Sequence, residues 1–186
     1  EGSPTQAAQL FVEYYLPSAS SGVAQETRTG LRFDAVDLPR GATISNAQLS
    51  FTADRDFSET FDLTIRVEET GDANTFSSTA GDIAGRSTSA TTVAWAGTLS
   101  GSNGDTFQSP DLATMINAIS NRGDWCGGNA LSFIIEGPSG ALPAWAVDGD
   151  PSLAPRLQLT YDYDSIPVGS SCLRRTTSTT VSASSD

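Results

Sequence analysis

The acidic side chains are the first candidates for chemistry in this sequence. Asp148 and Asp150 flank Gly149 in a short acidic turn. Glu68 and Asp72 lie in another polar stretch and could join them, because carboxylate oxygens are ligands that calcium prefers. The alternative is a solvated turn, since Asp and Gly are ordinary turn residues and no complete calcium-loop motif is present. Calcium is therefore the one candidate cofactor, with these four carboxylates as its expected ligands.

The sequence lacks the residue types that most catalytic sites need. It contains no His, which excludes a His general base and His-ligated zinc. No motif brings two carboxylates together for glycoside hydrolysis, and no phosphate-binding loop or nucleophilic Ser elbow occurs. We expect a non-catalytic protein.

Two cysteines, Cys126 and Cys172, are too few for a zinc site made of Cys alone. In an oxidising compartment they would form a disulfide that ties the region before the C-terminal tail to the body of the protein. The alternative is two buried free thiols. We favour the disulfide, because the low charge and high Ser and Thr content are typical of a secreted protein.

Aromatic side chains could form a platform on which a sugar ring stacks. The candidates are Trp95, Trp125 and Trp145, together with Tyr14 and Tyr15. The sequence does not show which of them are exposed, so we favour the alternative that they pack in the core.

The C-terminal segment 176–186, TTSTTVSASSD, has a composition that is usual for disordered ends. However, Thr179, Val181 and Ala183 alternate with polar residues at the period of a β-strand. We expect this segment to be a strand donated to a neighbouring copy, with Thr179, Val181, Ala183 and Asp186 at the interface. The alternative is that it packs on its own domain. Arg174 and Arg175 precede it and would either pair with a neighbour's acidic surface or stay solvated.

Length and composition fit a single extracellular domain. The 186 residues suffice for one large core, which we assign to residues 1–163, with a linker over 164–175. The net charge of −12 disfavours nucleic-acid binding. No apolar run is long enough to span a membrane. The chain begins with Glu rather than Met, which fits a processed product.

Short alternating segments indicate the elements that must position these residues. Strands are expected at 8–16, 31–36, 44–52, 61–67, 91–95, 129–136 and 155–163. One helix is expected near 110–121, with Ser109 as N-cap, Pro110 in its first position and an acid in its first turn. Leu112, Met115, Ile116 and Ile119 form its apolar stripe. Together they predict an all-β fold, an antiparallel β-sandwich of the jelly-roll type with one short helix.

Five pieces in this order resemble a known bacterial extracellular module: LRFDAVDLPRGATISNAQLSFTAD, LTIRVEETGDANTFS, SPDLATMINAISNRGDW, GNALSFIIEG and DGDPSLAPRLQLTYDY. The resemblance is to β-sandwich modules of the DNRLRE type, which are similar to carbohydrate-binding jelly rolls, and it covers about residues 31–163. It implies a non-catalytic module of a secreted, cell-surface or multidomain protein.

The sequence departs from this resemblance at its first strand. Such modules typically open with a strand like V-S-x-S-S-D, whereas here VSASSD stands at residues 181–186. The tail of one copy could therefore supply the first strand of the next, which would join copies head to tail. We expect a structural subunit or tandem repeat of an extracellular filament or surface fibre. The alternative is a carbohydrate-binding module of a secreted enzyme or adhesin, with polysaccharide as its partner.

Overall fold

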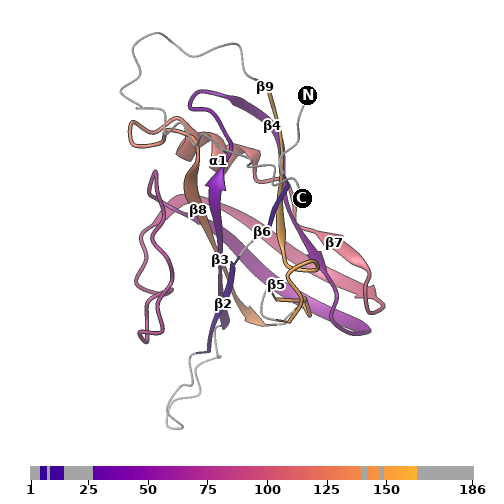
Figure 1. Cartoon of the computed structure of the whole chain (residues 1–186). Coiled ribbons are helices and arrows are strands. Elements are labelled where there is room, and N and C mark those ends of the chain that lie inside the picture. The colour runs from indigo at the N-terminus through magenta and orange to yellow at the C-terminus, as the bar shows by residue number, and fades with distance from the viewer. Residues whose placement is uncertain (1–4, 8, 15–26, 140–141, 147–148, 163–186) are drawn as a thin grey trace, which may run out of the picture.

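The computed structural model describes residues 5–7, 9–14, 27–139, 142–146 and 149–162. Two antiparallel sheets pack face to face, with one short helix beside them (Figure 1). The prediction of an all-β sandwich with one short helix is confirmed.

The order of strands in the two sheets is that of a jelly roll. The four-stranded sheet has the order β1-β9-β4-β7, and the five-stranded sheet the order β2-β3-β8-β5-β6. The strand bounds of the first sheet are β1 Thr5–Ala7, β9 Arg156–Asp162, β4 Thr43–Thr52 and β7 Thr106–Gln108. Those of the second are β2 Gln9–Tyr14, β3 Thr27–Val36, β8 Asn129–Ser139, β5 Phe57–Glu68 and β6 Thr88–Gly101.

The core between the sheets is filled by alternate residues of the strands, as the period of two requires. The alternating apolar residues of β4, β5 and β9 face this core, and all except the half-buried Tyr161 are buried: Ala47, Leu49, Phe51, Phe61, Leu63, Ile65, Val67, Leu157 and Leu159. The polar residues between them on β5 lie on the opposite face of the sheet. Alternation in these three strands therefore predicts the buried face correctly.

A bulge in β3 corrects one part of that prediction. Uniform alternation would place Ala35 inward with Leu31 and Phe33, but Ala35 is exposed and has a positive φ of 50°. The pairing of β3 with β8 shifts register between Phe33 and Val36, and Val36 is buried instead. One extra residue in a strand turns the following side chains to the other face.

Helix α1, Ala113–Ser120, starts later than the sequence predicts. Its apolar stripe is buried as expected, but Leu112 is the N-cap and the first turn holds no acid. Ser109 Oγ accepts a hydrogen bond from the Leu49 amide at 3.0 Å, and Asp111 Oδ1 accepts one from the Ala47 amide at 2.9 Å. These two side chains bond to β4, so they attach the segment before the helix to the sheet.

A second, smaller core lies on the outer face of the five-stranded sheet. Phe76 and Ile83, from the connection between β5 and β6, pack on Ile134 of β8. All three are at least 95% buried, so these contacts hold the connection against the sheet.

Candidate functional site

The most unusual feature of the described chain is the edge strand β6. It contains fourteen residues, TSATTVAWAGTLSG, with no charge and no proline. It pairs with β5 along its length, and no other described strand pairs with it. Natural sheet edges are usually protected by charges, proline or brevity, because free backbone groups attract other strands. β6 is an edge without these protections.

The sequence underestimates this strand at both ends. The alternation predicts a strand at 91–95 only, and the residues from Gly97 to Thr106 have the Gly-, Ser- and Asn-rich composition of an exposed loop. Instead, β6 begins at Thr88 and pairs as far as Gly101, which lies opposite Phe57. The long, well-patterned partner β5 extends the strand, so local composition gives the wrong boundary.

The inward row of β6 consists of Val93, Trp95, Gly97, Leu99 and Gly101. Trp95 is 8% exposed, and its ring lies 5.7 Å from those of Phe51 and Phe61. Gly97 has a φ of +149°, and a Cβ built there would meet no atom within 4 Å. The row therefore leaves open space between Trp95 and Leu99.

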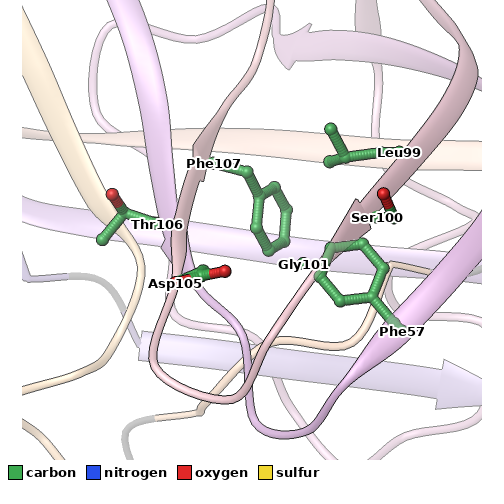
Figure 2. A pocket seen from close by; sticks show the side chains of 7 residues that line it. All are labelled: Phe57, Leu99, Ser100, Gly101, Asp105, Thr106 and Phe107. Atoms are coloured by element: carbon green, nitrogen blue, oxygen red, sulfur yellow. The ribbon is translucent and has the colours of Figure 1, made fainter.

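A hollow of about 280 Å³ lies at the C-terminal end of β6. Figure 2 shows the rings of Phe57 and Phe107 lining it, with Leu99 on β6 close by. The two ring centroids are 5.7 Å apart. Gly101 keeps the hollow open, because a Cβ there would lie 3.0 Å from Phe57 Cε1. β6 and β7 are edge strands of the two different sheets, so this hollow lies at the open side of the sandwich.

Carboxylates surround this end of β6. Asp56 Oδ1 accepts a hydrogen bond from the Asn103 amide at 2.8 Å, and Asp105 Oδ2 accepts one from the Ser102 amide at 2.8 Å. Asp54 lies 3.2 Å from Arg55, an exposed pair. The three carboxylates and the guanidinium of Arg55 leave a net negative charge near residues 54–56 and 102–105. This charge attracts cations.

The expected calcium ligands have other partners where the structure describes them. Glu68 Oε2 accepts a hydrogen bond from Arg86 at 2.9 Å, and Asp72 Oδ1 accepts one from the Ala130 amide at 2.8 Å. Asp150 Oδ1 accepts hydrogen bonds from the Ser152 hydroxyl and amide, which lower the pKa of Asp150. Asp148 lies outside the described residues.

Within the described ranges, no three Asp, Glu, His or Cys side chains form a group that could hold a metal. Calcium binding stays a prediction, and the geometry of the described carboxylates adds nothing to it.

Arg86 fastens the connection between β5 and β6 instead. Its side chain is 8% exposed and pairs with Glu68 at 2.9 Å and Asp82 at 3.2 Å. The guanidinium also donates to two backbone carbonyls of the loop and lies 4.1 Å from the centroid of the Phe76 ring. The hydrogen bond that the Ser77 amide donates to Asp82 is the main cause that lowers the pKa of this carboxyl. Partial desolvation opposes the shift, and the hydrogen bond from Arg86 adds to it. This arrangement stabilises a loop.

A second charged cluster joins three strands of the five-stranded sheet. Glu136 of β8 pairs with Arg28 of β3 at 2.9 Å and with Arg66 of β5 at 2.5 Å. Desolvation opposes the ionisation of Glu136, but hydrogen bonds from Arg66 and then Arg28 outweigh it and lower the pKa of the carboxyl. The cluster ties neighbouring strands together on the outer face of the sheet.

The aromatic residues do not form one exposed platform. Trp95 and Trp125 are buried, and Trp125 Nε1 donates to the Leu38 carbonyl at 2.9 Å. Trp145 is half-buried. The side chain of Tyr14 and the whole of Tyr15 lie outside the described residues. Core packing, the reading we favoured, is correct for Trp95 and Trp125.

The predicted polymer interface lies outside the described residues, as do the linker 164–175 and Cys172. This applies to Thr179, Val181, Ala183 and Asp186. Cys126 is not a free thiol in the described chain, and its pairing with Cys172 stays a prediction.

No protein-family model matches this chain, and no curated protein matches it either. The resemblance to DNRLRE-type modules therefore stays a prediction from the sequence. Among the helices in the described part, none has the length and apolar character to cross a membrane.

Proposed function

We propose that this chain is a non-catalytic structural subunit or repeat of an extracellular filament or surface fibre. Its copies join head to tail when the C-terminal segment 176–186 of one copy adds as a strand to a sheet of the next. The main support for this proposal is that β6 is a fourteen-residue edge strand without charge or proline. An added strand would bond its free N–H and C=O groups and cover the exposed edge.

The two surfaces of such a contact differ, and this supports a filament over a closed dimer. The donor is a terminal segment and the acceptor is an edge within the body, so each copy can use both at once. A contact between different surfaces repeats from copy to copy and builds an open chain unless the rotation closes a ring. Separate subunits and consecutive repeats of one polypeptide would form the same contact.

An extracellular location fits the composition of the chain. The expected disulfide between Cys126 and Cys172 would persist in an oxidising compartment. The net charge of −12 keeps individual copies soluble until strands pair.

Particle size in solution tests the proposal. The full chain is compared with a chain that ends at Arg175, by analytical ultracentrifugation across a concentration series. We expect the full chain to form large species and the shortened chain to stay a monomer with the same strand content by circular dichroism. If both chains form the same large species, segment 176–186 is not the donor and the proposal is wrong.

Carbohydrate binding is the second candidate, favoured by the half-buried ring of Phe57 in the hollow at the end of β6. An aromatic ring beside carboxylate and hydroxyl groups is suited to stacking under a sugar. This function predicts a monomer that binds polysaccharide and loses that binding when Phe57 is replaced by Ala. Binding of a polysaccharide panel by the full chain, measured by affinity electrophoresis, separates the two candidates.

A further inference from the structure

The polarity of the strand contact can be inferred from charges at one end of β6. This inference rests on the proposed function and names the acceptor site and its geometry. We propose that β6 takes residues 176–186 of a second copy as an antiparallel strand, with Val181 seated in the hollow between Phe57, Leu99 and Phe107.

The donor segment and β6 match in charge. Segment 176–185 is uncharged, as β6 is, but Arg174 and Arg175 precede it and Asp186 follows it. The C-terminal end of β6 is next to Asp56 and Asp105. An antiparallel donor brings its two arginines to these carboxylates and carries Asp186 away from them. A parallel donor would bring Asp186 toward the same carboxylates, where like charges repel.

The hollow selects the side chain that fills it. Val181 is the one large apolar residue of segment 176–186. Alternate residues of a strand added to β6 point toward the open side of the sandwich, where the hollow lies. Phe57, Leu99 and Phe107 supply the apolar part of its lining, beside the polar residues Ser100, Asp105 and Thr106. A valine there would bury most of its surface.

The spacing of the donor residues then fixes the register. When Val181 lies opposite Leu99 in an antiparallel pair, Ala183 lies opposite Gly97 and Thr179 opposite Gly101, the last residue of β6. Arg174 and Arg175 then follow beyond this end of the strand, on the side of the turns that hold Asp56 and Asp105. Gly97 has no side chain and open space around it, so Ala183 fits there without a clash. Charge, volume and spacing therefore agree on one register.

Two matched pairs of variants test the seat of Val181. Val181→Ser should weaken association about tenfold, the effect of losing one mostly buried valine side chain, whereas Ser182→Ala, on the other face of the donor, should leave it unchanged. Gly101→Val should weaken association by a similar factor, because its side chain would fill the hollow. Thr98→Val, on the outer face of β6, is its control. If each variant and its control weaken association by the same factor, Val181 does not occupy the hollow and this part of the proposal is wrong.

Cysteine crosslinking between two differently labelled populations of full-length chains tests direction and register. In the proposed register, Ser182→Cys of one copy faces Thr98→Cys of the other, and Thr180→Cys faces Ser100→Cys. In a parallel pairing that also places Val181 opposite Leu99, Thr180→Cys would face Thr98→Cys. We expect the 182–98 crosslink, as a covalent dimer, to form several-fold faster than the 180–98 crosslink.

The outcomes separate this inference from the proposed function. Faster formation of the 180–98 crosslink overturns the antiparallel direction. Large species without any crosslink to β6 place the donor at another edge, which overturns this inference and leaves the proposed function standing. Crosslinks within single chains show that the tail covers its own β6, and both proposals then fail.

Discussion

Phe76 lies directly against the backbone of Gly30, with its ring in the space that a side chain at position 30 would need. A Cβ built on Gly30 would lie 2.7 Å from Phe76 Cζ. Gly30 is in β3 and Phe76 in the connection between β5 and β6, so this contact fixes that connection to the outer face of the sheet. The connection leads directly into β6.

Gly30→Ala should destabilise the protein by about 1 to 3 kcal/mol, because the added methyl overlaps a packed ring. The measurement is urea unfolding of the full chain. Gly123→Ala is the matched control: a Cβ there would meet nothing within 4 Å, and its free energy of unfolding should change little. An equal loss of unfolding free energy in both variants would show that the packing of Phe76 does not require a glycine at position 30.

Arg86→Ala should cost about 2 to 3 kcal/mol, because it leaves the carboxylate of Glu68, whose side chain is only 13% exposed, without its partner. Arg55→Ala should cost less than about 1 kcal/mol, because that arginine is exposed beside Asp54. Both values come from chemical unfolding at the same pH. A small effect of Arg86→Ala would mean that water replaces the guanidinium at little cost.

Glu136→Gln should lower stability near neutral pH and have little effect in acid. The folded protein holds the pKa of Glu136 below its usual value of 4.5, so the ionised carboxylate stabilises the fold above that value. This contribution is lost as the pH falls through the folded pKa. We expect a difference of about 1 to 2 kcal/mol at pH 7, since Glu136 is partly exposed and solvent screens its two ion pairs.

The measurement is the free energy of unfolding of both proteins between pH 3 and pH 8. A difference that stays constant over this range would contradict an electrostatic role for Glu136.

A charge on the edge strand should block association. Leu99 is half-buried in the inward row of β6, and Leu99→Lys would place an ammonium group beside the incoming Val181. We expect at least tenfold weaker association by ultracentrifugation. Ala118→Lys, on the exposed face of α1, adds the same charge away from the edge and should not change association. Full association of the Leu99 variant would exclude β6 as the acceptor.

Much of the sandwich can be predicted from residue pattern alone. The inward faces of β4, β5 and β9 follow from alternation, because each of these strands has one buried face. The stripe of α1 follows from its period of 3.6 for the same reason. The start of the helix does not, because Ser109 bonds to β4, and Asp111 Oδ1 accepts hydrogen bonds both from the Ala47 amide of β4 and from the Ala113 amide at the first position of α1. This arrangement depends on tertiary contacts.

The candidate site was harder to predict than the fold. Glycine and serine in residues 97–102 indicate a loop, yet pairing with β5 extends β6 to Gly101. The hollow combines Phe57, Leu99 and Phe107 from three strands, and no local pattern brings such residues together. The sequence alone does not identify the unprotected edge. The absence of charge from Thr88 to Gly101 can be read in the sequence, but it indicates an acceptor only once this stretch is known to be an edge strand.

The most direct test of the central claim is a structure of the assembled full-length chain by electron cryo-microscopy. We predict a strand from a neighbouring copy, residues 176–186, lying antiparallel along β6 with Val181 beside Phe57 and Leu99. A filament in which β6 is open to solvent, or is covered by a strand of its own chain, would contradict this account.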